Sequence, residues 1–61
     1  MKLFILVECV LTLSEKFEYT NMGIYPSWES AEVSRIEFTE LFQDAYIQYY
    51  IEECEFYPDG E

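Results

Sequence analysis

The sequence predicts a small α+β fold in which three strands form one sheet and a single amphipathic helix covers one of its faces. Apolar residues recur at helical spacing only in residues 27–45, and the stretches on both sides have extended character. The order is therefore strand, strand, helix, strand. We expect the first two strands to form an antiparallel hairpin and the helix to return the chain, so that the third strand pairs with the first.

Residues 2–13 are interpreted as the first strand. The apolar run from Leu3 to Val7 has five residues and is interrupted by Glu8, which makes it shorter than the 7–15 residues of a signal-peptide core. Both faces of this strand are apolar, which is typical of a central strand covered on both sides. A single helix covers only one face, so the pattern leaves open what covers the other.

Residues 14–16 form a polar turn, and residues 17–25 continue as the second strand of the hairpin. Gly23 lies inside this strand and indicates a bulge or a close backbone approach. Residues 46–57 form the last strand, in which the apolar parity changes near Glu52 and Glu53; a second bulge there would restore the register. Residues 58–61 are turn-like.

The helix is predicted to begin after Pro26, with Ser27 as its N-cap and Glu29 in its first turn, near the positive end of the helix dipole. Arg35 falls at the edge of the apolar stripe, where its charge can reach a neighbouring carboxylate. We expect the stripe that faces the sheet to consist of Trp28, Ala31, Phe38, Leu41, Phe42 and Ala45.

The charge balance restricts the possible partners. The chain has thirteen Asp and Glu residues but only three Lys and Arg residues, so its net charge is −10. Its length of 61 residues allows one domain. Direct binding of nucleic acid or of an anionic membrane needs cations that the chain lacks. The charge instead favours a basic partner, or serves only to keep an aromatic-rich chain soluble. No apolar run approaches a membrane span, and we expect a cytoplasmic protein.

Catalytic chemistry is not expected. The chain has no His, and Cys9 and Cys54 are its only cysteines. We interpret them as reduced thiols in apolar strands, with a disulfide as the alternative if the two strands pair. Adjacent carboxylates such as Glu52 and Glu53 point to opposite faces of a strand and do not converge. The spacing of Glu52, Glu53, Glu55 and Asp59 matches no known loop that binds a divalent cation. We interpret these residues as solvated surface charges. We therefore expect neither an enzyme, nor a cofactor, nor a metal site.

Residues 23–32 resemble a group of small uncharacterised phage and bacterial proteins. The shared pattern is Gly-Ile-Tyr-x-Ser-x-Glu-x-Ala, followed by a helix and by a strand similar to Tyr-Ile-Glu-Glu at residues 50–53. The resemblance extends over nearly the whole chain and implies the strand-strand-helix-strand fold and a phage or prophage origin. It implies no activity. This chain lacks the Lys residues usual on such a helix, so its charge is more one-sided.

Two surfaces are candidates for binding. The leading hypothesis is a phage-encoded inhibitor whose acidic, DNA-mimicking surface binds the basic site of a host nuclease, CRISPR component or other defence protein. The alternative is a structural or assembly module that forms homodimers through the sheet face that the helix leaves uncovered. The residues predicted to bind the partner are Glu29, Glu32, Val33, Ile36, Glu37, Glu40, Asp44, Glu52, Glu53 and Glu55, and those predicted to form the oligomer interface are Phe4, Leu6, Tyr49 and Tyr50.

Overall fold

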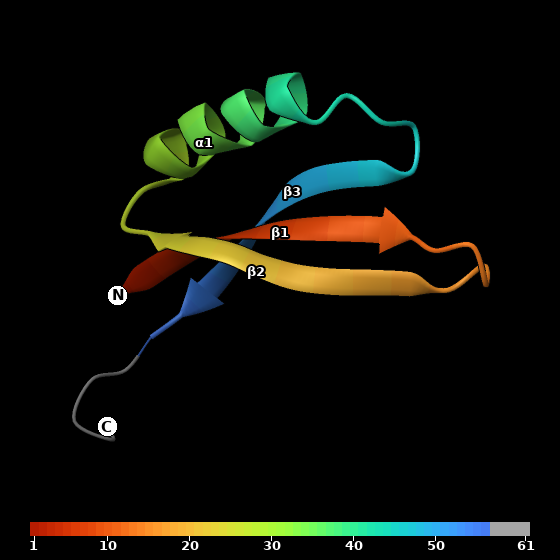
Figure 1. The fold of residues 1–61 in the computed structure, drawn as a ribbon. Coiled ribbons are helices and arrows are strands. Elements are labelled where there is room, and N and C mark those ends of the chain that lie inside the picture. The colour runs from red at the N-terminus through yellow and green to blue at the C-terminus, as the bar shows by residue number, and fades with distance from the viewer. Residues whose placement is uncertain (57–61) are drawn as a thin grey trace.

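Four elements build the structure, a computed structural model that describes residues 1–56. They are β1 (Lys2–Leu11), β2 (Phe17–Tyr25), α1 (Trp28–Leu41) and β3 (Ile47–Glu55). The strands form one antiparallel sheet in the order β2-β1-β3, and α1 lies across one face of it (Figure 1). The α+β class, the element order and the central position of β1 are confirmed. The predictions for residues 57–61, namely the end of the last strand and the turn after it, lie outside the described residues.

The hairpin between β1 and β2 closes through residues 12–16. The backbone N–H of Thr12 donates to the carbonyl of Lys16 at 2.8 Å, and that of Glu15 donates to the carbonyl of Thr12 at 2.9 Å. Glu15 adopts a left-handed backbone conformation, with φ of 62°. Thr12 and Leu13 therefore belong to the turn, and β1 ends two residues earlier than the sequence pattern predicts.

The bulge expected at Gly23 is confirmed. Leu6 pairs with Gly23 but Val7 pairs with Asn21, so Met22 is an extra residue in β2. A methyl group on Gly23 would lie 3.0 Å from Oη of Tyr25, so a larger residue here would crowd the Tyr25 ring. The prediction of a second bulge, near Glu52 and Glu53 in the last strand, is wrong.

The register of β3 with β1 runs without a shift from Ile47 to Glu55. Cys54 therefore lies on the same sheet face as Tyr50, and Ile51 lies on the opposite one. Because both sheet faces carry apolar residues, the change of parity needs no bulge.

The start of α1 matches the sequence prediction, whereas its end does not. The hydroxyl of Ser27 accepts a hydrogen bond from the backbone N–H of Ser30 at 3.2 Å, which confirms the N-cap. The helix ends at Leu41, with Phe42 as its C-cap. Ala45, predicted to continue the core stripe, is instead exposed in the turn before β3.

The core under α1 is small. Leu6 and Ala31 are fully buried, Tyr49 is 8% exposed, and the ring of Phe38 stacks on that of Tyr49 with centroids 5.6 Å apart. The phenol of Tyr49 donates a hydrogen bond to Oε2 of Glu8 at 2.7 Å, which satisfies both polar groups beneath the helix.

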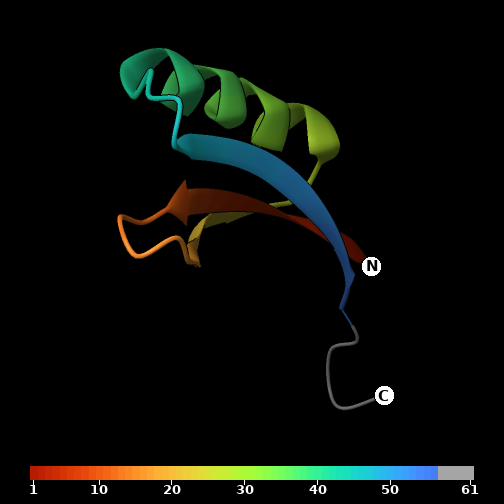
Figure 2. The same ribbon diagram turned by 90° about the vertical axis from the view of Figure 1, so that its right-hand side faces the viewer.

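The rest of the predicted stripe is wrong, since Trp28, Leu41 and Phe42 are 49%, 72% and 51% exposed. Within residues 1–56, three twisted strands support the helix, and β3 bends away from it toward its C-terminal end in both views (Figures 1 and 2). The sheet therefore contacts the middle of α1 better than its ends.

The two cysteines are free thiols, as expected. Cys9 pairs with Tyr19 and Gln48, whereas Cys54 pairs with Leu3. Leu3 and Cys9 are six positions apart on β1, roughly 20 Å at the rise of a strand. This distance is too long for a disulfide within one chain.

Replacing Gly23 with Ala should lower the free energy of unfolding by about 1–3 kcal/mol, because the new methyl group would crowd the Tyr25 ring. Urea unfolding followed by circular dichroism measures this loss. The same substitution in a Tyr25→Ala background should cost much less, since the crowded ring is gone. An equal cost in both backgrounds would assign the requirement for glycine to the backbone.

Tyr49 should be the source of a late step when the tyrosines are titrated. Burial, followed by the hydrogen bond and charge of Glu8, raises the pKa of Tyr49 from 10.0 to about 12. The unfolded chain therefore loses this proton first, so stability should fall as the pH rises from 10.0 toward about 12. Tyrosinate absorbance should show the step in wild type and in the exposed-site control Tyr46→Phe, but not in Tyr49→Phe. A step near pH 12 that survives in Tyr49→Phe would contradict this assignment.

Candidate functional site

The outward side of α1 carries a cluster of carboxylates around two aliphatic side chains. We call this surface the acidic helix face; it consists of Glu29, Val33, Ile36, Glu37 and Glu40. Val33 and Ile36 are 57% and 44% exposed, as predicted. The ion pairs among residues 1–56 join Lys2 to Glu53 and Glu32 to Arg35, so the three carboxylates of this face are unpaired there. They extend over roughly 16 Å of helix.

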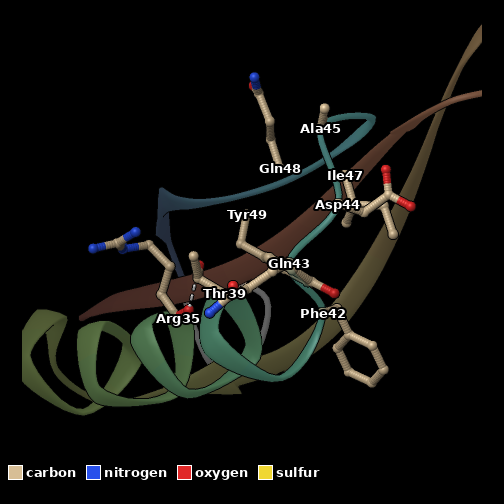
Figure 3. Close-up of a pocket in the computed structure, with 9 residues that line it drawn as sticks. All are labelled: Arg35, Thr39, Phe42, Gln43, Asp44, Ala45, Ile47, Gln48 and Tyr49. Carbon is tan, nitrogen blue, oxygen red and sulfur yellow. Dashed lines mark hydrogen bonds between the residues drawn. The ribbon is translucent and has the colours of Figure 1, made fainter.

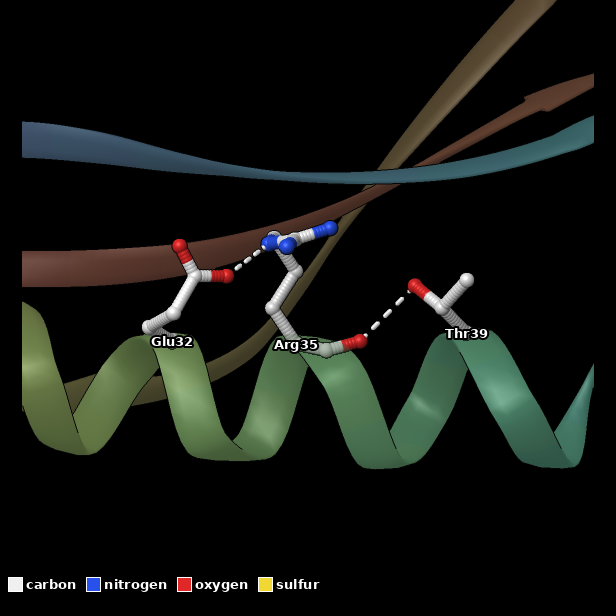
Figure 4. A network of polar contacts seen from close by, with 3 residues as sticks. All are labelled: Glu32, Arg35 and Thr39. Atoms are coloured by element: carbon white, nitrogen blue, oxygen red, sulfur yellow. Dashed lines mark hydrogen bonds and ion pairs between the residues drawn. The ribbon is translucent and has the colours of Figure 1, made fainter.

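Glu32 was predicted to belong to this surface but does not. Its side chain is only 22% exposed and forms an ion pair with Arg35, one turn along α1 (Figure 4). The hydroxyl of Thr39 donates to the backbone carbonyl of Arg35 at 2.8 Å. The charge of Glu32 is therefore compensated at the edge of the helix–sheet contact, as the position of Arg35 in the sequence indicated.

Asp44 was also predicted to lie on the acidic side of the helix, but α1 ends at Leu41 and Asp44 follows it. Its Oδ1 accepts a hydrogen bond from the backbone N–H of Tyr46 at 2.8 Å, and its carbonyl accepts one from the N–H of Ile47 at 3.1 Å. This pattern is an Asx-turn, in which the side chain replaces a backbone acceptor. Asp44 thus shapes the entry into β3.

The three predicted carboxylates of β3 are divided between the two sheet faces. Glu53 and Glu55 lie on the side of α1, and Glu52 lies on the opposite side. Glu53 pairs with Nζ of Lys2 at 2.9 Å, and this hydrogen bond and charge raise the pKa of the Lys2 ammonium. Because β3 bends away from α1 here, these residues do not continue the acidic helix face (Figure 2).

The second surface is the side of the sheet opposite α1, which we call the open sheet face. Phe17, Tyr19, Ile24 and Tyr50 on this face are 60%, 62%, 59% and 40% exposed. The side chains of Tyr19 and Tyr50 lie near the central residue Val7, which is 7% exposed. By register, the face consists of Leu3, Ile5, Val7, Cys9 and Leu11 of β1, Phe17, Tyr19, Asn21 and Ile24 of β2, and Gln48, Tyr50, Glu52 and Cys54 of β3.

The predicted oligomer interface had the wrong strand parity at three of its four residues. Phe4, Leu6 and Tyr49 face α1, and Leu6 is fully buried there; only Tyr50 lies on the open sheet face. The sequence did not reveal the side because β1 is apolar on both. Phe17, Tyr19 and Ile24 were missed. The pairing of Phe17 with Leu11 places Phe17 and Tyr19 on this face by alternation, whereas Ile24 reaches it only because the bulge at Met22 changes the parity of β2.

A cavity of about 500 Å³ lies between the C-terminal half of α1 and the start of β3 (Figure 3). Its charged residues have structural partners: Arg35 pairs with Glu32, and Asp44 holds the turn. Within residues 1–56, no three potential metal-ligating side chains gather in one place. The cavity therefore shows no arrangement that indicates a reaction. Its lining residues are Arg35, Thr39, Phe42, Gln43, Asp44, Ala45, Ile47, Gln48 and Tyr49.

In the described part of the chain, α1 has neither the length nor the apolar character of a membrane-crossing helix. Comparison with protein-family models, curated proteins and solved structures gave no match to the chain. The resemblance of residues 23–32 to small phage and bacterial proteins therefore stays a prediction.

Proposed function

We propose that the protein is a non-catalytic binding protein that docks the acidic helix face onto a basic surface of another protein. The observation that supports this is the set of unpaired carboxylates Glu29, Glu37 and Glu40 around the exposed side chains of Val33 and Ile36. The net charge of −10 speeds encounter with a positive surface. The two aliphatic side chains supply apolar contacts that become desolvated on binding.

The resemblance suggests a concrete role for this binding. The protein would be a phage-encoded inhibitor in the host cytoplasm, and its target would be a nuclease, a CRISPR component or another defence protein with a nucleic-acid groove. Each DNA strand carries one phosphate per about 3.4 Å of helix axis, so roughly 16 Å of α1 corresponds to about five phosphates. Three carboxylates replace only some of these. The surface therefore fits a local contact in a basic groove better than an extended imitation of DNA.

Charge reversal on α1 should abolish this binding without unfolding the protein. The variant Glu29→Lys/Glu37→Lys/Glu40→Lys is compared with Glu15→Lys/Glu18→Lys/Glu55→Lys, which has the same net charge but altered residues outside the acidic helix face. In pull-downs from host lysate followed by titration of the recovered partner, the first variant should bind at least about tenfold more weakly than the control.

Raising the salt from about 0.1 M to about 0.5 M should release the partner from the wild-type protein, since screened carboxylates lose their attraction. A partner held equally well at both salt concentrations would contradict an electrostatic contact. Equal losses in the two triple variants would show that only the overall field matters, and would rule out the acidic helix face as the binding site.

A further inference from the structure

We propose that the open sheet face is covered by a second copy of this chain, which gives a homodimer whose two sheets pack face to face and whose helices lie on the outside. This inference does not depend on the proposed function, because it concerns the opposite side of the sheet from the acidic helix face. Three properties of the open sheet face support it: the incomplete core of one chain, the distribution of charge, and the available area.

One chain by itself has too little core. Leu6, Val7, Ala31 and Tyr49 are its buried apolar residues within the described part, and Leu6 is the largest side chain that is completely buried. Yet 51% of the sequence is hydrophobic. Chains of this size commonly gain stability by sharing a core with another copy. The central strand β1 places apolar side chains on both faces, and a second sheet would bury the outer set as α1 buries the inner one.

The charge distribution favours the open sheet face for contact between two copies. Residues 1–56 contain eleven carboxylates, and Glu52 is the one that lies on the open sheet face. The phenol of Tyr50 is neutral at physiological pH, and burial and the charge of Glu52 raise its pKa further. Two chains of charge −10 repel each other in most orientations. If they meet through their open sheet faces, the other carboxylates stay outside this contact.

The exposed area of the open sheet face is sufficient for a specific dimer interface of small size. Phe17, Tyr19 and Tyr50 are 60%, 62% and 40% exposed, and each has about 200 Å² of surface when fully exposed. With the aliphatic residues of β1 and β2, the face offers roughly 600 Å² per protomer, or about 1,200 Å² for the pair. This is the lower limit for specific interfaces. In a two-fold arrangement, Val7 of each copy would lie near the symmetry axis.

The test is sedimentation equilibrium of the whole chain from about 1 µM to about 300 µM, at about 0.05 M and about 0.5 M salt. We expect a monomer–dimer equilibrium in which salt strengthens the dimer, because salt screens the repulsion between the two acidic chains. Tyr19→Glu/Tyr50→Glu should weaken the dimer at least about thirtyfold. Val33→Glu/Ile36→Glu, which adds the same charges at exposed apolar positions of α1, should leave it within about threefold of the wild type.

A second measurement does not require the interface variant to fold. In Cys54→Ser, the remaining thiol of Cys9 lies on the open sheet face, paired with Tyr19. Its labelling by a thiol reagent should slow as the protein concentration and the salt concentration rise. A chain that stays monomeric at the highest concentration and salt, with constant Cys9 labelling, would overturn the proposal and leave the face to a different protein. Equal weakening by the two double variants would overturn it as well.

Discussion

The central position of β1 is the constraint on which the rest of the structure depends. This strand pairs with β2 on one side and with β3 on the other, and it is apolar on both faces. The chain supplies a single helix within the described residues, so only one face can be covered from within. Leu6 and Val7 are neighbours in sequence, but α1 covers the first, and aromatic side chains of the flanking strands screen the second.

The order of the elements could be predicted because local chemistry determines it. Pro26 ends a strand, Ser27 caps a helix, and Gly23 admits a bulge, and each of these effects acts within a few residues. The end of α1 could not be read in the same way, since Phe42 and Ala45 continue the apolar spacing. The Asx-turn at Asp44 was the local signal that the helix stops before that point.

The sites were harder to predict than the fold because they depend on which side of β1 the helix occupies. That choice results from the whole packing arrangement, and strand parity alone cannot make it. Hence Phe4, Leu6 and Tyr49 were assigned to the wrong face. The exposure of Glu29, Glu37 and Glu40 was predicted correctly, because these residues are on the polar side of a periodic helical pattern. Glu32 differs from the prediction because it forms an ion pair with Arg35, and Asp44 differs because it lies in the turn before β3.

The uninterrupted register of β3 leaves nine residues with a regular outer edge, a shape onto which a strand of another chain can be added. The bulge in β2 makes the other edge of the sheet less regular. Glu52, Glu53 and Glu55 are on the regular edge strand, where a like-charged neighbouring chain would be repelled. The carboxylates of β3 therefore oppose the open-ended strand-to-strand pairing that a regular edge would otherwise permit.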